Sequence, residues 1–254
     1  MAAAQARTGT KGTIAVTGAN RGIGAAIALA LAREGYSVAC LTRGGGLPDA
    51  GADAGLRARL LPIKCDVLDE QAVRAALARA AERAGGLTGL VNNAGLHVTA
   101  KSAELPTVEY ERLMAINATA VFAVAREAYP HMARAGGGLI VNIGSFFDKL
   151  GVKRNLAYCA SKAAVGAITR CLAVEWARDN IRVVDVAPGY IVTDLNRDAL
   201  TQGRLREYLE KRIPRGEPGT AEDVARLVAA LFREDLRFLS GETIYIDGAQ
   251  GIAH

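Results

Sequence analysis

Short apolar segments alternate with longer, alanine-rich segments along almost the whole of this 254-residue sequence. The short segments are rich in Val, Ile and Leu and have the length of buried strands, whereas the longer ones have the length of helices. The predicted strands span residues 13–17, 37–42, 59–65, 88–93, 138–143, 181–186 and 242–247. The predicted helices span residues 22–34, 69–84, 107–135, 156–178 and 220–232.

Alternating strands and helices, with strands that are apolar throughout, are typical of a parallel sheet covered on both faces. Right-handed crossovers then give a doubly wound α/β fold, so we predict a Rossmann-type parallel sheet of seven strands with helices on both faces. No linker rich in Pro, Gly or Ser divides the sequence. We therefore expect one domain over residues 13–254, a flexible tail at residues 1–12 and a surface loop at residues 44–55.

One segment breaks the alternation. Residues 194–216 are polar and charged, have a helix-like pattern and lie between Pro188 and Pro214. Ligands of open α/β sheets bind outside the carboxyl ends of the strands, and this segment follows the end of such a strand. We expect residues 194–216 to form a substrate lid.

A glycine-rich turn follows the first predicted strand and leads directly into a helix. The sequence is TGANRGIG, with Gly18, Gly22 and Gly24. Glycines permit a tight turn and a close backbone approach, and the helix N-terminus offers free N–H groups and a positive dipole end to a pyrophosphate. The GxxxGxG spacing differs from the commonest dinucleotide fingerprint, but its place between a strand and a helix predicts a nucleotide site.

Composition excludes several classes of function. The longest apolar run, residues 23–32, is too short for a membrane span, and the start of the sequence has no secretory signal, so we expect a cytoplasmic protein without membrane contact. Three isolated histidines and four widely spaced cysteines do not form a metal-binding pattern; we expect no metal and buried free thiols, at Cys40, Cys65, Cys159 and Cys171. The net charge of +5 is spread over helix faces, so we expect no nucleic-acid partner.

Tyr158 and Lys162 stand four residues apart in an otherwise small and apolar helical run. That spacing places both side chains on one face of a helix. A free phenol has a pKa of about 10, but a neighbouring ammonium favours the phenolate. The pair therefore predicts a tyrosine that acts as a general acid and base at neutral pH.

With these two motifs the sequence resembles the short-form branch of the short-chain dehydrogenase/reductase family, in which TGxxxGxG and YxxxK occur together. The resemblance extends from Thr13 to Gly248. Its further landmarks are CDV at 65–67, NNAG at 92–95, Asn117, Ser145 and PGYIVT at 188–193. Several motifs in the family's order and separation make the resemblance specific.

The resemblance implies a single dinucleotide-binding catalytic domain that interconverts a ketone and a secondary alcohol by hydride transfer. It implies four catalytic residues, Asn117, Ser145, Tyr158 and Lys162. Tyr158 would exchange a proton with the substrate oxygen, Ser145 would position that oxygen, and Lys162 would also contact the nicotinamide ribose. Asn117, within a long helix, would take part in a water-linked proton relay. The departures from the family pattern, Gly144, Val184 and Asp185, are not expected to touch these four.

The resemblance also implies a set of cofactor-binding residues. Asp66 would lie by the adenine, Asn93 would hold the sheet beside the cofactor, and Thr193 would contact the nicotinamide carboxamide. The full set is Thr17, Gly18, Asn20, Arg21, Gly22, Ile23, Gly24, Thr42, Arg43, Asp66, Val67, Asn93, Ala94, Gly95, Tyr158, Lys162, Pro188, Gly189, Ile191 and Thr193.

The end of the second strand favours NADP over NAD. An acidic residue there would bind the adenosine ribose and repel a 2′-phosphate. This sequence instead has Thr42 followed by Arg43, and a second cation, Arg21, lies in the glycine turn. Guanidinium groups suit bidentate phosphate recognition. We expect NADP(H) as the preferred cofactor, with NAD possible if Arg21 is a solvated turn residue and Arg43 only begins a loop.

The substrate is the least constrained part of the prediction. Phe146 and Phe147 follow Ser145, with Lys149, Lys153 and Arg154 close in sequence, which suits an acyl chain, a ring or an anionic ketone unless the charges are only solvated. Within the family the sequence resembles 3-oxoacyl-carrier-protein reductases overall, whereas LAVEWA at 172–177 is more similar to sugar-acid and polyol dehydrogenases. A nucleotide-binding sensor without turnover is the alternative of another class. The resemblance further implies a homotetramer, with contacts through residues 107–135 and 156–178 and the C-terminal region.

Overall fold

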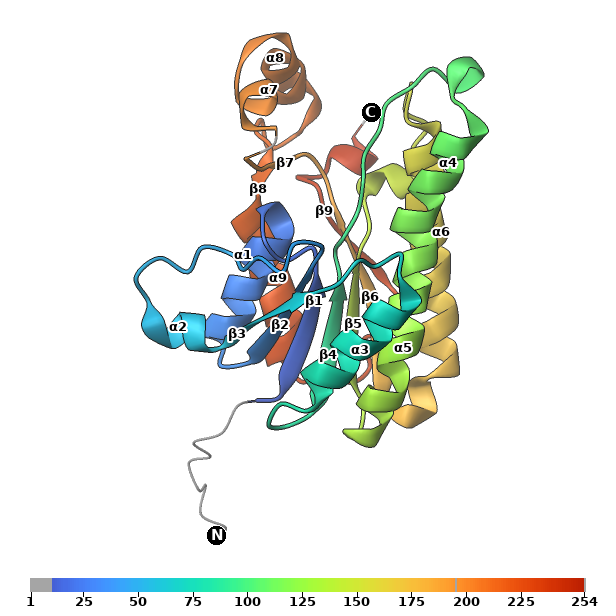
Figure 1. The fold of residues 1–254 in the computed structure, drawn as a ribbon. Helices are drawn as coiled ribbons and strands as arrows, with labels where there is room; N and C mark the ends of the chain where they lie inside the picture. The colour runs from blue at the N-terminus through green and yellow to red at the C-terminus, as the bar shows by residue number, and fades with distance from the viewer. Residues whose placement is uncertain (1–10, 195, 254) are drawn as a thin grey trace.

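The computed structural model describes residues 11–194 and 196–253. Seven strands form one sheet in the order β3-β2-β1-β4-β5-β6-β9, and every neighbouring pair is parallel (Figure 1). The strands are β1 (Thr13–Thr17), β2 (Ser37–Thr42), β3 (Leu60–Lys64), β4 (Leu87–Asn92), β5 (Gly138–Ile143), β6 (Ile181–Pro188) and β9 (Thr243–Ile246). The predicted doubly wound fold is confirmed.

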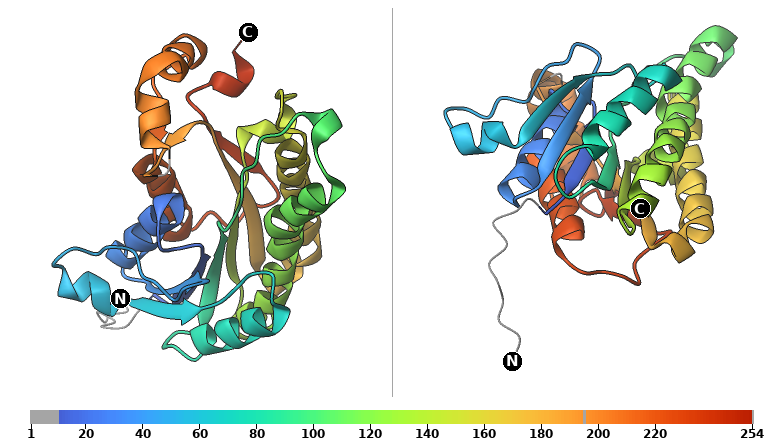
Figure 2. Two further views of the ribbon diagram at one scale, coloured as in Figure 1. Left: turned by 45° about the horizontal axis from the view of Figure 1, so that its top comes forward. Right: turned by 60° about the horizontal axis from the view of Figure 1, so that its bottom comes forward.

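Helices cover both faces of this sheet (Figure 2). On one face α1 (Gly22–Arg33) packs beside α9 (Ala221–Arg233), and their apolar residues form one core cluster with the sheet. On the other face a second cluster includes α3 (Glu70–Ala81), α5 (Ala120–Arg134) and α6 (Leu156–Glu175). A sheet buried on both sides explains why its strands are apolar throughout rather than alternating.

The prediction missed three local features. The helix expected over residues 107–135 is divided into α4 (Thr107–Met114) and α5 by a π-helical turn at Ala115–Thr119. The loop expected at residues 44–55 runs into a short helix, α2 (Ala54–Ala58), whose first turn is capped by the Asp53 carboxylate. The two-residue strands β7 (Ile191–Val192) and β8 (Gly219–Thr220) pair with each other and are too short to leave a periodic signal.

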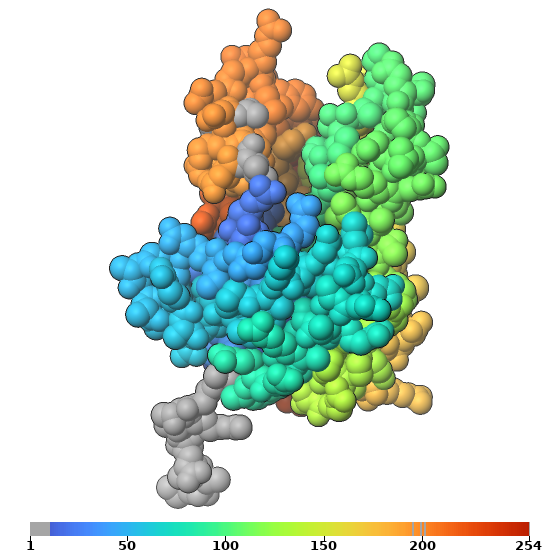
Figure 3. Space-filling view, viewed as in Figure 1, coloured from blue at the N-terminus to red at the C-terminus, as the bar shows by residue number. Residues whose placement is uncertain are grey.

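The segment expected to form a lid contains α7 (Arg197–Thr201) and α8 (Gly203–Arg212). Leu200, Leu209 and Ile213 give it a small apolar cluster separate from the two main ones. It stands above the carboxyl ends of the strands, and the space-filling view shows a cleft between it and the region of α4 (Figures 1 and 3). Residue 195 lies outside the described residues, as do residues 1–10 of the predicted tail.

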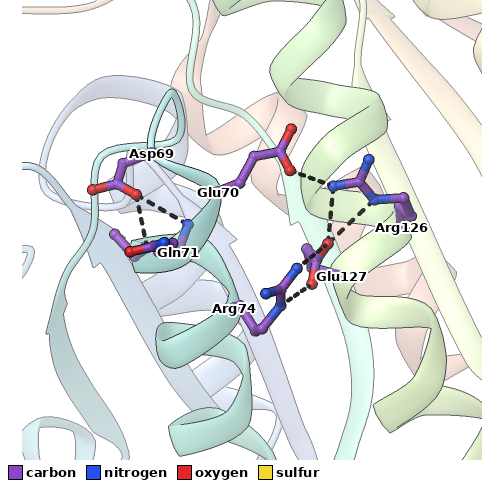
Figure 4. Close-up of polar contacts among 7 residues, drawn as sticks. Asp69, Glu70, Gln71, Arg74, Arg126 and Glu127 are labelled. Carbon is purple, nitrogen blue, oxygen red and sulfur yellow. Dashed lines mark hydrogen bonds and ion pairs between the residues drawn. The ribbon is translucent and has the colours of Figure 1, made fainter.

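An ion-pair network joins α3 to α5 on the surface (Figure 4). The Arg126 guanidinium donates to Glu70 at 2.7 Å and to Glu127 at 2.9 Å, and Arg74 donates to Glu127 at 2.9 Å. Asp69 caps the first turn of α3 through the N–H groups of Gln71 and Ala72. Arg126 and Glu70 are exposed, so their ion pair contributes little to stability, whereas the shared Glu127 side chain is only 13% exposed.

Leu90 lies in the middle of β4 and is fully buried, within the cluster beneath α3, α5 and α6. We expect Leu90→Ala to lower the free energy of unfolding by about 2–5 kcal/mol, because the change removes buried methyl groups and leaves a cavity. Urea unfolding followed by circular dichroism measures this. Val108→Ala, at a 65% exposed position of α4, is the control and should stay within about 0.5 kcal/mol. Equal effects of the two changes would contradict the assignment of this core.

The expectation of buried thiols is wrong for Cys171. Cys40 and Cys65 are buried, and burial raises the pKa of their thiols to about 12 and about 11. Cys159 is half-buried, whereas Cys171 is exposed because it occupies the solvent side of α6, next to the inward-facing Leu172. All four are free cysteines.

The described residues contain neither a membrane-spanning helix nor a cluster of metal-ligating side chains. No helix in residues 11–194 and 196–253 is long and apolar enough to cross a membrane. Over the same ranges, no three His, Cys, Asp or Glu side chains are grouped so that they could hold a metal ion.

Candidate active site

Two adjoining cavities lie at the carboxyl edge of the sheet. One, of about 430 Å³, borders the glycine turn and the ends of β2 and β3. The other, of about 460 Å³, borders the end of β5 and the beginning of α6. They share Ile23, Asn93, Gly95, Leu96 and Thr193 as wall residues, so a ligand in one reaches the other. We call them the nucleotide cavity and the catalytic cavity.

The glycine turn has the backbone that its sequence predicts. Gly18 adopts φ +67°, and a side chain there would also meet the backbone of Ala94. Gly24 lets α1 approach β1, because a Cβ at this position would collide with the carbonyl oxygen of Gly18. Within the part of the chain that the structure describes, no side chain caps the first turn of α1. Its N–H groups therefore remain available to an anion in the nucleotide cavity.

Thr17 and Asn93 fasten the turn to the neighbouring strand. The Thr17 hydroxyl oxygen accepts the N–H groups of Asn93 and Ala94, both at 2.9 Å, and the Asn93 amide donates to the carbonyl of Thr17 at 2.9 Å. Thr17 itself is buried and lines neither cavity. Its place in the structure is thus beneath the cavity floor rather than in its wall.

Three arginines line the nucleotide cavity, Arg21, Arg43 and Arg112. Arg112 forms an ion pair with Glu109 at 3.0 Å. Among the described residues, the exposed guanidinium groups of Arg21 and Arg43 have no hydrogen-bond or ion-pair partner. Thr42 is buried and donates its hydroxyl to the carbonyl of Gly46 at 3.2 Å. Neither Thr42 nor Arg43 puts a carboxylate at the end of β2.

Most of the remaining residues expected at the cofactor line one of the two cavities. Asn20, Gly22, Asp66, Val67, Ala94 and the two free arginines border the nucleotide cavity. Pro188, Gly189 and Ile191 border the catalytic cavity. Asp66 also accepts the N–H of Leu68 at 3.1 Å, which fixes the direction of its carboxylate. Leu41, Leu68 and Ile116 are wall residues that the sequence did not single out, and Cys65, known from the CDV landmark, also lines this cavity.

Asn117 lies in the π-helical turn between α4 and α5 and is fully buried. Its amide accepts the N–H of Leu96 at 2.8 Å and donates to the carbonyl of Leu96 at 2.8 Å and to the Ser161 hydroxyl at 3.1 Å. Asn117 therefore joins the loop after β4 to α6 directly behind the catalytic cavity. The long regular helix expected around it is wrong, because the turn carries π geometry, which is frequent at functional sites.

Ser145, Tyr158 and Lys162 meet in the wall of the catalytic cavity. Ser145 caps the 3-10 turn Phe146–Lys149 and accepts the N–H of Phe147 at 3.3 Å, so its hydroxyl hydrogen is free to point at Tyr158. Lys162 is buried, and its ammonium donates to the carbonyl of Ile143 at 2.7 Å and lies 5.7 Å from the centre of the Tyr158 ring. The predicted one-turn pairing on α6 is present.

Burial and neighbouring groups set the protonation of this trio. Burial raises the pKa of the Tyr158 phenol, while a hydrogen bond from the Ser145 hydroxyl acts against that rise. Burial lowers the pKa of Lys162 to about 8, and the negative charge of Asp185 acts in the opposite direction. Lys162 is therefore still an ammonium at neutral pH, next to a phenol that holds its proton.

Aromatic side chains form the far wall of the catalytic cavity. The rings of Phe147 and Tyr158 meet edge to face with centres 6.0 Å apart, and Tyr190 stands 6.1 Å from Phe147. Phe146 packs behind Phe147 at 4.7 Å and does not line the cavity. Leu200 and Leu205 of the segment 194–216 complete the wall.

His97 is the main residue that the sequence prediction missed, since it stood alone in the sequence. Its ring centre lies 4.5 Å from that of Tyr158, and its Nε2 lies 2.6 Å from Oδ1 of Asn155. The Asn155 amide donates to the carbonyl of Lys153, which fixes that oxygen as the acceptor and places the hydrogen on Nε2. Only its place directly after the NNAG motif, in a loop at the end of a strand, could have signalled it.

A cationic rim and solvated surface charge were the two interpretations of Lys149, Lys153 and Arg154, and these side chains lie outside the wall of the catalytic cavity. Lys149 lies over the Tyr245 ring, 3.5 Å from its centre, and neither Lys153 nor Arg154 lines the cavity. Among the described wall residues, Lys162 is the only one with a charged side chain. Lys149 ends the 3-10 turn and lies on the Tyr245 ring, whereas Lys153 and Arg154 lie beyond that turn, in the loop before α6.

A parallel Rossmann-type sheet with a nucleotide cavity and a Ser/Tyr/Lys group beside it defines a nicotinamide-dependent oxidoreductase. Residues 18–249 match the family described as enoyl-(acyl carrier protein) reductase. The sequence is 37% identical to the 3-oxoacyl-[acyl-carrier-protein] reductase MabA of Mycobacterium tuberculosis over 95% of this chain and 94% of that protein. It is 36% identical to the 2-(R)-hydroxypropyl-CoM dehydrogenase of Xanthobacter autotrophicus over 92% and 96% of the two chains.

A solved structure of a relative has the same fold as this chain. A putative 2-deoxy-D-gluconate 3-dehydrogenase from Agrobacterium tumefaciens with bound NADP superposes with a TM-score of 0.83 at 30% identity, covering 95% of this chain and 96% of that one. The chain belongs to the short-chain dehydrogenase/reductase family. It is therefore an oxidoreductase that acts on alcohol or carbonyl groups with a nicotinamide cofactor.

Proposed function

We propose that this protein is an NADP(H)-dependent oxidoreductase that interconverts an apolar ketone and its secondary alcohol. The observation that carries the proposal is the meeting of Ser145, Tyr158 and Lys162 in a cavity that opens into the nucleotide cavity. A hydroxyl beside a phenol suits a carbonyl oxygen, which needs one group to position it and another to protonate it.

The residues of the chain divide the chemistry among them. Ser145 donates its hydroxyl to the substrate oxygen, Tyr158 gives that oxygen a proton in reduction or takes it in oxidation, and Lys162 stabilises the phenolate by its charge. Asn117 holds the loop at Leu96 and α6 together, and we assign it to the end of a water-linked proton path from Lys162. A bound nicotinamide cofactor supplies or accepts the hydride.

The nucleotide cavity fits a phosphorylated dinucleotide. Pyrophosphate suits the uncapped N-terminus of α1 and the turn at Gly18, and the unpaired guanidinium groups of Arg21 and Arg43 suit a 2′-phosphate. Asp66 borders the same cavity at the end expected for adenine, and Thr193 lines both cavities, which suits a contact with the nicotinamide carboxamide. NADP bound to the Agrobacterium relative supports the same preference.

The lining of the catalytic cavity favours an acyl or ring-bearing ketone over a sugar acid. Phe147, Tyr190, Leu200 and Leu205 present apolar surface, and among the described lining residues only Lys162 is charged. A carboxylate on the substrate would have no cation apart from the catalytic one, which makes an anionic sugar the weaker alternative. The name of the MabA relative, a 3-oxoacyl reductase, points to the same class.

A spectrophotometric screen with NADPH and NADH in parallel tests this function. The panel contains 3-oxoacyl thioesters, cyclic and aromatic ketones, and sugar acids. We expect cofactor oxidation with the first two groups and little with the third. Turnover confined to sugar acids would replace the proposal by the sugar-acid alternative. NADPH binding without turnover of any ketone, unaltered by Tyr158→Phe, would favour a nucleotide sensor.

Phe147→Ala should weaken substrate binding selectively. Phe147 is buried against Tyr158 and Tyr190, and loss of its ring removes apolar contact worth about 1.5–3 kcal/mol to a substrate that covers it. We expect KM for a long acyl or ring ketone to rise about tenfold or more, with a smaller effect for a short ketone. Arg79→Ala, at an exposed site on α3 that borders neither cavity, is the control, and steady-state kinetics measure both. An equal loss for short and long ketones would contradict this wall assignment.

We also propose that the protein assembles into a homotetramer and works in the cytoplasm. Large apolar side chains remain exposed on helices and near the C-terminus, including Phe122 on α5, Val174 on α6 and the fully exposed Phe238. Such surface is typical of subunit contacts. Four free thiols suit a reducing compartment. Size-exclusion chromatography with light scattering measures the assembly, and a monomeric mass would refute it.

A further inference from the structure

A charged residue lies buried behind the catalytic group. Asp185, in the middle of β6, has no exposed surface. Its Oδ2 accepts the hydroxyl of Thr243 from β9 at 3.2 Å, and its Oδ1 has no hydrogen-bond partner among the described residues. A carboxylate in an apolar sheet is costly unless another group balances its charge.

Gly144 makes room for this carboxylate. It directly precedes Ser145, and a Cβ at position 144 would collide with both carboxylate oxygens of Asp185. The N–H of Gly144 donates to the carbonyl of Val186 at 2.8 Å and also lies close enough to favour the charged carboxylate. Gly144 and Asp185, two departures from the family pattern, therefore depend on each other. The Asp185 carboxylate occupies the space that a side chain at position 144 would fill.

Lys162 is the cation whose charge this carboxylate balances. The Lys162 ammonium is buried and donates only to the carbonyl of Ile143, the residue before Gly144, among the described residues. Its positive charge lowers the pKa of Asp185, which burial alone raises and which stands at about 6. In return, the negative charge of Asp185 raises the pKa of Lys162, which burial lowers to about 8.

Two other titratable groups lie near Asp185, Asp148 and Tyr245. Asp148, from the 3-10 turn after β5, also faces Asp185, but its like charge raises the pKa of Asp185. Tyr245 of β9 donates its phenol to Asp148 at 2.9 Å and keeps its proton, because burial and the surrounding carboxylates raise its pKa to about 12. Of the charged groups in the described residues that shift the pKa of Asp185, Lys162 is the only cation.

We propose that Asp185 is a positioning residue that keeps Lys162 protonated and thereby keeps Tyr158 ready to give up its proton. Asp185 does not contact the substrate; it acts through Lys162 from the face of the sheet that α6 covers. The proposal rests on the proposed function for its kinetic consequence, but the coupling between the two charges exists without any substrate.

The coupling is tested without activity. In protein labelled with ¹³C at the aspartate carboxyl carbons, the Asp185 resonance is assigned by its loss in Asp185→Asn. We expect it to titrate near pH 6 in the native protein. Lys162→Met, which removes the charge and keeps the chain length, should move that midpoint upward by about one pH unit. An unchanged midpoint in folded Lys162→Met would overturn the proposal, whatever substrate the enzyme uses.

The kinetic consequence is tested in the direction of alcohol oxidation. The acidic limb of the kcat profile reports the pKa at which Tyr158 loses its proton. Asp185→Asn lowers the pKa of Lys162, so less positive charge faces the phenolate, and the limb should move to higher pH by about one unit, a loss of about tenfold in kcat at neutral pH.

A second variant tests whether the effect comes from the charge of the Asp185 carboxylate or from misfolding and local structural change. Thr243→Val keeps the carboxylate but removes its hydroxyl donor, so it should raise the Asp185 midpoint and shift the acidic limb in the same direction by less. Superimposable pH profiles for both variants and the native enzyme would overturn the proposal. If the protein oxidises no alcohol, the proposed function fails while the carboxyl titration still decides the coupling.

Discussion

Tyr158→Phe is expected to lower kcat by about 10²–10⁴-fold while leaving cofactor affinity within a small factor of the native value. The change removes one oxygen, the group that we propose exchanges a proton with the substrate, and leaves the ring to pack against His97 and Phe147. Stopped-flow or steady-state absorbance of NADPH measures kcat, and fluorescence titration measures cofactor binding.

The matched control for this variant is Tyr129→Phe. The Tyr129 phenol donates to Asp179 at 3.0 Å on the surface and borders neither cavity. It should keep native kcat. Native kcat in Tyr158→Phe would remove the tyrosine from the mechanism, and equal losses in the two variants would show a general effect on folding instead.

The double change Arg21→Ala with Arg43→Ala is expected to reduce the preference for NADPH over NADH by about 100-fold or more. Each guanidinium is expected to form charge-assisted hydrogen bonds to the 2′-phosphate, worth about 1.5–3 kcal/mol each, and NADH lacks that phosphate. Dissociation constants for both cofactors, measured by fluorescence at two salt concentrations, give the ratio directly.

Arg112→Ala is the matched control for cofactor preference. Arg112 lines the same cavity but is paired with Glu109, so its loss should change the affinities for NADPH and NADH by similar factors. If the double variant weakened both cofactors equally, the two arginines would serve the pyrophosphate or the turn, and NADP preference would need another source.

The fold and the reaction class could be predicted from the sequence because their signals are local. The alternation of strands and helices gave the sheet, with strand ends within two residues of those observed. The glycine turn is contiguous, and Tyr158 and Lys162 are one helical turn apart, so the one-turn periodicity of the helix alone places them together. Ser145 and Asn117 were placed by the family resemblance rather than by local pattern.

The tertiary structure decided what surrounds the reacting group. His97, Tyr190 and Leu205 come from three loops or helices far apart in the chain, and no spacing rule brings them to one cavity. Lys149 lies over the Tyr245 ring at the end of the 3-10 turn, and Lys153 and Arg154 lie in the loop beyond that turn, outside the cavity wall. In the sequence, Asp185 stood out only as a departure from the family pattern within a strand. Its side chain comes near Lys162 because α6 packs on β6.

The sequence by itself determined the sheet, the nucleotide turn and the tyrosine–lysine pair, since each depends on residues close together in the chain. Only the tertiary structure decided which side chains line the cavity beside Tyr158 and which buried charge lies near Lys162. Those contacts join distant segments, and their energies depend on distance and burial, which a linear pattern does not contain.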